Sequence, residues 1–283
     1  MSARLRTATD AEMEAIWPAV SSAHLFSTEE AFREWRDEAP WRFQMNDAGD
    51  AVVLERWREH LDVLSIRSMW CPPRRLPDVL DGVRAIASDH GLARVMSPLV
   101  DVSAARPYLR TGMEECDRLV ALQGRVTRVR RSMPPQGVAL RRATPDDIED
   151  IAALERATFD GFWRRGASEI ECSIRSDRAV VARTAADLVG YTLSTVSRGA
   201  GTLGRLAVAE EARCIGIGRA LVADVAAGFE RQGVMMMALC TQRANRASRA
   251  LYAACGLREL PGTLVFAIDP ITVDRRGGGR RSA

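Results

Sequence analysis

The spacing of hydrophobic residues divides the second half of the chain into alternating helices and strands. Ile217, Leu221, Val225 and Phe229 recur at four-residue intervals, which places them on one face of a helix. Segments that alternate between polar and apolar residues, or stay apolar, predict strands. The predicted strands are 138–142, 178–184, 188–196, 202–209, 234–240 and 263–268, and the predicted helices are 146–157, 168–176, 217–232 and 247–254. This mixture predicts an α/β (α+β) fold.

Three features of the first half recur in the second half in the same order, which indicates an internal repeat. Segments 5–16 and 140–151 each consist of a short predicted strand, a Thr/Asp turn and an acidic first helical turn. A helix closed by glycine and followed by a strand is predicted at 76–98 and again at 217–241. The third feature is a Tyr-to-Gly spacing shared by Tyr108–Gly112 and Tyr252–Gly256.

The repeats and the composition between them predict the domain organisation. Met133-Pro134-Pro135 lies in an arginine-rich stretch and disfavours regular structure, which is typical of a linker. We therefore predict a first domain at 1–124, a linker at 125–137, a second domain at 138–268 and a disordered basic tail at 269–283.

The composition indicates a globular protein with enough hydrophobic residues to form a core. The chain has 283 residues, of which 47% are hydrophobic and 27% charged, enough for two domains of ordinary size. No apolar run is long enough to span a membrane, and the amino terminus lacks the apolar core of a signal peptide. We therefore expect a cytoplasmic location and no membrane partner.

The charged residues and the cysteines exclude several kinds of site. The net charge is +3, and all 40 basic residues are arginine, so a lysine-dependent P-loop is excluded. The arginine-rich segments 125–142 and 275–281 lack interleaved aromatic residues, so we expect no nucleic-acid partner. The six cysteines contain no C-x-x-C pair, and the three histidines all lie in the first third. We therefore expect free thiols and no metal site.

A glycine-rich turn at 213–221 carries the clearest sign of a binding site. It follows the predicted strand at 202–209 and opens the predicted helix. Glycines at Gly216 and Gly218 let a ligand approach the backbone, and N–H groups at a helix start bind anions such as a pyrophosphate. A glycine turn without a ligand is the alternative. A dinucleotide-binding turn fits less well, because Leu221 stands at the third glycine position.

Two motifs in this region resemble those of the GNAT superfamily of N-acetyltransferases. Leu206-Ala207-Val208 followed by Arg213-x-x-Gly216-x-Gly218 is similar to the family's acetyl-CoA signature. Asn245-x-x-Ser248-x-x-Leu251-Tyr252-x-x-x-Gly256 is similar to its second motif, with the expected strand between the two. The resemblance covers about 138–268. It implies two tandem GNAT-like domains, each with a mixed twisted sheet, and a V-shaped opening between two central strands that admits the pantetheine arm.

The resemblance assigns cofactor-binding roles to residues that match the motifs. The strand Leu206, Ala207 and Val208 would pair with pantetheine, and Asn245 would contact the acetyl-CoA near its thioester. The remaining implied cofactor-binding residues form the turn that would hold the pyrophosphate: Arg213, Cys214, Ile215, Gly216, Ile217, Gly218 and Arg219.

The resemblance also implies direct transfer of an acetyl group to an amine. Tyr252 would protonate the departing thiolate, since a positioned phenol can act as a general acid. A backbone N–H of the 206–208 strand would stabilise the oxyanion. The glutamate that many relatives carry as a base on this strand is absent, which leaves the base open. The alternatives are a water chain or one of three carboxylates, namely Glu155, Asp160 and Glu169.

The first half departs from the family pattern, and the acceptor stays open. Pro72-Pro73 occupies the place of the glycine turn and removes backbone donors, so the first domain is interpreted as a degenerate GNAT-like domain without its cofactor. Phe162 and Trp163 are predicted to line the acceptor pocket. Thr241-Gln242 is similar to the TDP-fucosamine acetyltransferase group, which favours an amino sugar as the small-molecule amine.

Several alternatives to the amino sugar remain. The tandem arrangement is similar to mycothiol synthase, although the acidic stretch that precedes the asparagine there is missing. A protein amine is a further candidate acceptor, and a non-catalytic acyl-CoA-binding regulatory module is the alternative to an enzyme. A monomer with pseudo-dimeric domains and a homodimer are both compatible with the sequence.

Overall fold

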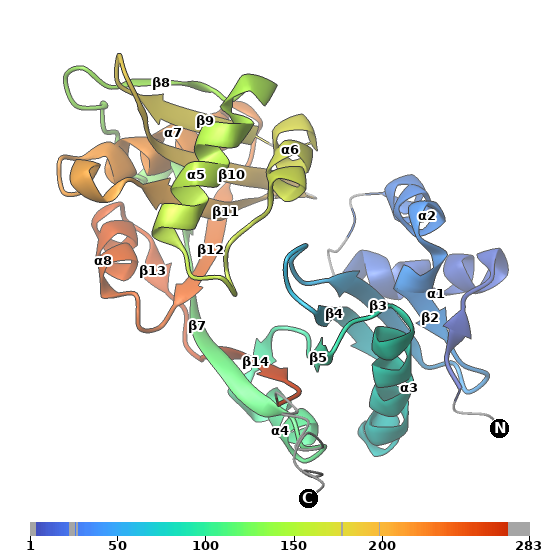
Figure 1. Ribbon diagram of the computed structural model, residues 1–283. Helices are drawn as coiled ribbons and strands as arrows, with labels where there is room; N and C mark the ends of the chain where they lie inside the picture. The colour runs from blue at the N-terminus through green and yellow to red at the C-terminus, as the bar shows by residue number, and fades with distance from the viewer. Residues whose placement is uncertain (1–3, 23–25, 27, 177, 198, 271–283) are drawn as a thin grey trace, which may run out of the picture.

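The computed structural model describes residues 4–22, 26, 28–176, 178–197 and 199–270. Within these residues the chain forms eight α-helices and one mixed 14-stranded sheet (Figure 1). The main strand order is β1-β2-β3-β4-β5-β14-β7-β12-β11-β10-β9-β8, while β13 pairs with β7 and β6 pairs with β14. The predicted α/β class is therefore confirmed.

The first half of the chain supplies one end of this sheet. Its first elements are β1 (Arg6–Thr7), α1 (Asp10–Ser22), α2 (Glu29–Glu38), β2 (Phe43–Met45), β3 (Ala51–Arg56) and β4 (Val63–Trp70). They are followed by α3 (Leu76–Asp89), β5 (Arg94–Met96), β6 (Val100–Asp101), α4 (Val102–Leu109) and β7 (Glu114–Arg125). The apolar face of α3 packs on β4 through Val79, Leu80 and Val83, all of which are buried.

The second half repeats this order at the other end of the sheet. It begins with β8 (Ala139–Arg142), α5 (Ile148–Thr158), α6 (Ala167–Ser176), β9 (Arg178–Arg183), β10 (Leu188–Ser197) and β11 (Ala200–Val208). It continues with α7 (Ile217–Arg231), β12 (Met236–Gln242), α8 (Arg246–Ala254), β13 (Arg258–Glu259) and β14 (Leu264–Ile268).

Helices cover both faces of the second half's sheet. Adjacent residues on β10 show this, because Tyr191 points at Glu155 of α5, whereas a side chain at Gly190 would meet Leu221 and Ile217 of α7. All four predicted helices of this half are confirmed, with ends that differ from the predictions by a few residues.

The two halves exchange strands. Leu119–Arg125 of β7 pairs with β12 of the second half, and β14 of the second half pairs with β5, β6 and β7. Figure 1 shows β7 running from one lobe to the other. The sheet is therefore continuous, and neither half completes its own sheet without a strand from the other.

The segment predicted as a linker is partly packed against the second half. Residues Val126–Arg128 form a 3-10 turn, Val126 and Val129 are buried in the second half's core, and the Arg130 N–H donates to the carbonyl of Cys255 at 3.3 Å. Asp269, the first residue of the predicted tail, is ordered and pairs with Arg84 of α3 at 2.8 Å. Residues 271–283 lie outside the described part of the chain.

Candidate active site

The two central strands of the second half separate along most of their length. β11 and β12 pair in parallel only through Ala200–Thr202 and Met236–Ala238. Beyond this point β11 pairs with β10 alone, and β12 pairs with β7 alone. The facing edges at 203–208 and 239–242, all within the described residues, therefore have backbone groups open to a ligand. This is the V-shaped opening that the family resemblance implies.

The glycine turn lies at the open end of this V. Gly216, the residue before α7, has φ +105°, and Cys214 has φ +65°, both in the region where glycine is favoured. The Ala220 N–H donates to the Gly216 carbonyl at 3.0 Å. The N–H groups before Ala220 belong to the free first turn of a helix, which carries a partial positive charge. The turn therefore has the chemistry needed to bind an anion such as a pyrophosphate.

Arg213 and Gly218 have roles within the protein itself. The Arg213 Nε donates to the carbonyl of Val208 at 3.2 Å and so attaches the turn to the end of β11. A Cβ at Gly218 would lie 3.1 Å from the Cδ2 of Leu251, so glycine allows α7 and α8 to approach each other closely. These contacts place the turn, while Cys214, Ile215 and Arg219 are exposed at its surface.

The strand predicted to bind pantetheine has a bulge before it. Leu193 pairs with Arg205 and Ser194 with Leu203, so Gly204 is the extra residue of β11. Beyond the bulge Leu206, Ala207 and Val208 pair in register with β10, and Ala207 is buried. The bulge follows Thr202, the last residue of β11 that pairs with β12.

The two α8 motif residues differ in how their polar groups are engaged. Asn245 caps the helix, because its Oδ1 accepts the Ser248 N–H at 3.0 Å. Tyr252 is only 6% exposed, and its hydroxyl has no hydrogen-bond partner among the described residues. Burial, with a smaller effect of Cys255, raises the pKa of Tyr252 to about 12. The phenol is thus protonated at neutral pH and free to donate.

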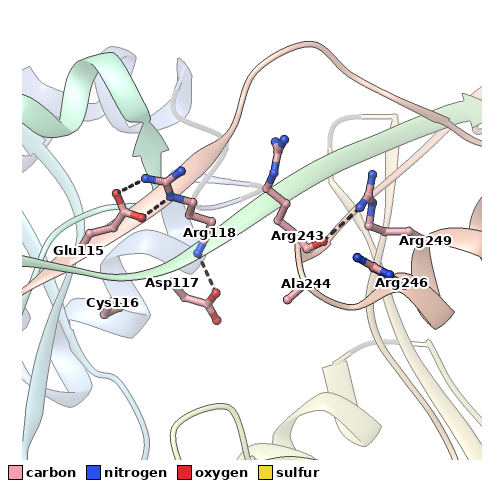
Figure 2. A pocket seen from close by; sticks show the side chains of 8 residues that line it. All are labelled: Glu115, Cys116, Asp117, Arg118, Arg243, Ala244, Arg246 and Arg249. Carbon is pink, nitrogen blue, oxygen red and sulfur yellow. Dashed lines mark hydrogen bonds and ion pairs between the residues drawn. The ribbon is translucent and has the colours of Figure 1, made fainter.

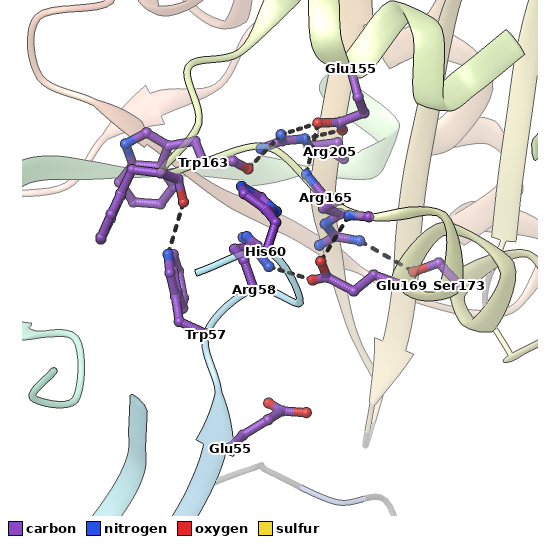
Figure 3. A network of polar contacts seen from close by, with 12 residues as sticks. Glu55, Trp57, Arg58, His60, Glu155, Trp163, Arg165, Glu169, Ser173 and Arg205 are labelled. Carbon is purple, nitrogen blue, oxygen red and sulfur yellow. Dashed lines mark hydrogen bonds and ion pairs between the residues drawn. The ribbon is translucent and has the colours of Figure 1, made fainter. Parts of the chain in front are cut away.

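Glu155, one candidate base, is fully engaged inside the protein. The carboxylate is completely buried and accepts a bond from the Tyr191 hydroxyl. It also accepts bonds from the Arg205 Nε at 2.6 Å and from the Arg165 N–H at 3.1 Å (Figure 3). Burial alone would raise the pKa of Glu155, but the Arg205 guanidinium and the Tyr191 hydroxyl hold that pKa below its usual value. Glu155 is therefore an ionised partner of Arg205 and has no free oxygen for an incoming amine.

The other two candidate carboxylates are also engaged. Asp160 Oδ1 accepts the N–H groups of Phe162 and Trp163, at 3.0 and 3.2 Å. Glu169 binds Arg58 of the first half at 2.6 Å and accepts the Gly166 N–H at 3.0 Å. All three carboxylates thus stabilise the loop between α5 and α6.

The first half forms a wall against this loop. The indole Nε1 of Trp57, in the loop after β3, donates to the carbonyl of Phe162 at 2.8 Å, and His60 Nε2 lies 2.6 Å from the carbonyl oxygen of Gly161 (Figure 3). Trp163 donates from its indole Nε1 to Asp117 of β7 at 2.9 Å. These contacts hold the two aromatic residues predicted to line an acceptor pocket against the first half.

The corresponding turn of the first half lacks the donors of the glycine turn. Pro72 and Pro73 have no backbone N–H, and Arg75 of the same turn binds Asp50, whose side chain is 1% exposed, at 2.6 Å. β4 and β5 separate as β11 and β12 do, because they pair only through Val63–Ser65 and Arg94–Met96. The first half thus has the same strand geometry without an anion-binding turn.

No group of three or more histidine, cysteine, aspartate or glutamate residues is arranged to hold a metal ion in the described ranges. None of the helices described is long and apolar enough to cross a membrane.

Comparisons with known proteins agree with this geometry. Residues 148–257 match the sequence profile of the acetyltransferase (GNAT) family, and no curated protein matches the chain. A GCN5-related N-acetyltransferase from Sphaerobacter thermophilus has a TM-score of 0.68 and 19% identity, covering 93% of this chain and 94% of that one. A tandem GNAT protein from the clavulanic acid biosynthesis pathway has a TM-score of 0.60 and 17% identity, covering 80% and 81% of the two chains.

A third solved structure has a similar fold over most of the chain. It is a GCN5-related glucosamine N-acetyltransferase region of a fungal multi-domain β-N-acetylglucosaminidase, with a TM-score of 0.66 and 13% identity. It covers 93% of this chain and 38% of that one. At these low sequence identities, the similarity to the three structures concerns the fold alone.

Proposed function

The chain carries an acetyltransferase (GNAT) family domain over residues 148–257, and on that premise we propose that it transfers an acetyl group from acetyl-CoA to the primary amine of a small molecule such as an amino sugar. The separation of β11 from β12 above the glycine turn is the observation that carries the proposal. It combines an unpaired strand edge for the pantetheine arm with a helix start for the pyrophosphate.

The donor would be held by the second half. Backbone groups of Leu206, Ala207 and Val208 pair with the pantetheine arm along the open edge of β11. The N–H groups of Cys214–Arg219 bind the pyrophosphate, and Asn245 contacts the arm near the thioester. The first half binds no donor, because its turn carries two prolines and an ion pair between Arg75 and the buried Asp50.

The chemistry is a direct transfer. The amine nitrogen attacks the thioester carbonyl carbon, a backbone N–H of β11 stabilises the oxyanion, and the carbon–sulfur bond then breaks. Tyr252 gives its proton to the departing thiolate, for which its unpartnered, protonated hydroxyl is suited. The proton lost by the amine passes to water, since Glu155, Asp160 and Glu169 are engaged by the protein.

An amino sugar is the proposed acceptor class. Thr241-Gln242 is similar to the TDP-fucosamine acetyltransferase group, and one structure of similar fold is a glucosamine N-acetyltransferase region.

A thioester-cleavage assay tests the function directly. Acetyl-CoA is incubated with the full chain and a panel of amino sugars, polyamines, amino acids and peptides, and free thiol is followed. Product mass must rise by one acetyl group on the amine. If acetyl-CoA binds but no amine promotes thiol release, the domain is a non-catalytic acyl-CoA-binding module.

A further inference from the structure

A cleft of about 510 Å³ lies between β7 and the amino end of α8 (Figure 2). Four arginines line it, from two segments that are far apart in sequence: Arg118 from β7 and Arg243, Arg246 and Arg249 from the end of β12 and the start of α8. The lining also holds two carboxylates, Glu115 and Asp117. The lining therefore carries more positive than negative side chains.

Two of the four guanidinium groups are neutralised within the protein. Arg118 forms an ion pair with Glu115, and Arg249 pairs with Glu259 at 2.9 Å. Their charges are therefore satisfied without a ligand.

The other two guanidinium groups have no acidic partner in the part of the chain that the structure describes. Arg243 donates to the neutral hydroxyl of Thr263 at 3.0 Å, and Arg246 has no side-chain partner among the residues that the structure describes. Both are exposed at the cleft. Asp117 does not pair with either of these guanidinium groups, since its Oδ2 accepts hydrogen bonds from Trp163 and Gln242.

The cleft and the donor opening flank the same strand end. β12 has the V-shaped opening on its β11 side and the cleft on its β7 side. The short turn after β12, closed by a bond from the Asn245 N–H to the Gln242 carbonyl at 3.0 Å, separates them. A small molecule anchored in the cleft would extend over this turn towards the V-shaped opening, where the proposed function places the thioester.

We infer that the cleft binds an anionic group, a phosphate or a carboxylate, of the acceptor, with Arg243 and Arg246 as its ligands. The inference rests on the proposed function and narrows its substrate to an acidic amine, such as an amino-sugar phosphate. Guanidinium groups suit this task, because their planar donors match the oxygens of phosphate and carboxylate. The anion fixes the acceptor's position while the amine stays free to react.

Calorimetry with two matched sugars tests the inference. Glucosamine 6-phosphate and glucosamine are titrated into the full chain saturated with CoA. We expect the phosphate-bearing sugar to bind at least tenfold more tightly, and the double variant Arg243→Gln, Arg246→Gln to remove that advantage. The control Arg156→Gln, Arg231→Gln removes two exposed guanidinium groups from α5 and α7 and should keep the advantage. Equal affinities for the two sugars in the parent would overturn the inference.

A second titration separates the acceptor's anion from that of the donor. CoA and 3′-dephospho-CoA are titrated into the parent and the double variant. We expect the variant to bind both as the parent does. If the variant instead weakens CoA and leaves 3′-dephospho-CoA unchanged, the cleft holds the donor's phosphate and the inference is wrong. Failure of CoA to bind the parent at all would count against the proposed function. The two sugars would then be titrated into the chain without CoA, and equal affinities there would overturn the inference about the cleft.

Discussion

Asp117 on β7 accepts a 2.9 Å hydrogen bond from the indole Nε1 of Trp163, and this contact connects a strand of the first half to the loop after α5. The same oxygen accepts the Gln242 Nε2 at 2.8 Å, at the end of β12. One carboxylate therefore holds the α5–α6 loop, the exchanged strand β7 and the end of β12 together.

Removing this carboxylate should destabilise the fold. We expect Asp117→Ala to lower the free energy of unfolding by about 1–3 kcal/mol, because two part-buried donors lose their acceptor. Chemical denaturation followed by tryptophan fluorescence measures it. Glu114→Ala, an exposed change on the same strand, should stay within about 0.5 kcal/mol of the parent. If the two variants unfold alike, the contact does not stabilise the fold.

Breaking the buried ion pair of Glu155 and Arg205 should lower the free energy of unfolding more than Asp117→Ala does. Glu155→Ala leaves the Arg205 guanidinium, 9% exposed, without its charge partner, so we expect a loss of about 3–5 kcal/mol at pH 7. Glu169→Ala, whose ion pair with Arg58 is more exposed, is the matched comparison and should cost less. Equal losses in denaturant unfolding would contradict the assignment.

The same pair predicts how stability depends on pH. The folded-state pKa of Glu155 lies below its ordinary value of 4.5, so the carboxylate stabilises the fold above pH 4.5. That contribution is lost as the pH falls through the lowered pKa. The difference in stability between the parent and Glu155→Ala should therefore shrink in acid, as denaturation at pH 7 and at pH 3 will test.

Local sequence patterns predicted which helices and strands form more accurately than the residues at which they begin and end. The strand predicted at 234–240 runs instead from Met236 to Gln242, because the Val234 N–H still bonds to the carbonyl of Phe229 and closes α7. Gly233, with φ +74°, makes that helix end possible. A run of apolar residues does not reveal which of them a preceding helix will use.

The sequence patterns did not predict which strands and side chains far apart in the chain would pair. The pattern at 263–268 predicted a strand but carried no information about its partners, which are β5, β6 and β7 of the first half. The partner of Arg205 was missed for a similar reason, since Glu155 lies 50 residues away. The available signal was an arginine inside an apolar strand, which requires a buried acid to face it.

The donor turn can be tested by a pair of glycine substitutions. Gly216 and Gly91 both have positive φ, +105° and +67°, and both have open space where a Cβ would lie. Alanine at either position should cost a similar amount of stability through backbone strain. We expect only Gly216→Ala to weaken CoA binding, by about tenfold or more, because it shifts the N–H groups at the start of α7. CoA is titrated into the two folded variants to measure this difference. Equal CoA affinities of the two variants would place the pyrophosphate elsewhere.

The final prediction concerns the proton donor. Tyr252→Phe keeps the ring and removes only a hydroxyl that has no partner among the described residues. We therefore expect turnover to fall by about 10²-fold while CoA affinity stays at the parental value. Tyr108, the matching tyrosine of the first half, is also buried with its pKa raised to about 12. Tyr108→Phe is therefore the control and should retain turnover.

The pH profile separates a proton donor from a packing residue. Because burial raises the pKa of Tyr252 to about 12, the phenol stays protonated at pH 10, where an ordinary tyrosine would be half ionised. Parental turnover should then show no loss with an apparent pKa near 10. If Tyr252→Phe keeps full turnover on the identified amine, Tyr252 is not the proton donor. If the parent loses activity around pH 10 and this variant does not, the pKa of Tyr252 is not raised. Because the hydroxyl has no partner among the described residues, its removal leaves none of their buried groups unsatisfied. A loss of turnover without a loss of stability would therefore support a role of this hydroxyl in the reaction.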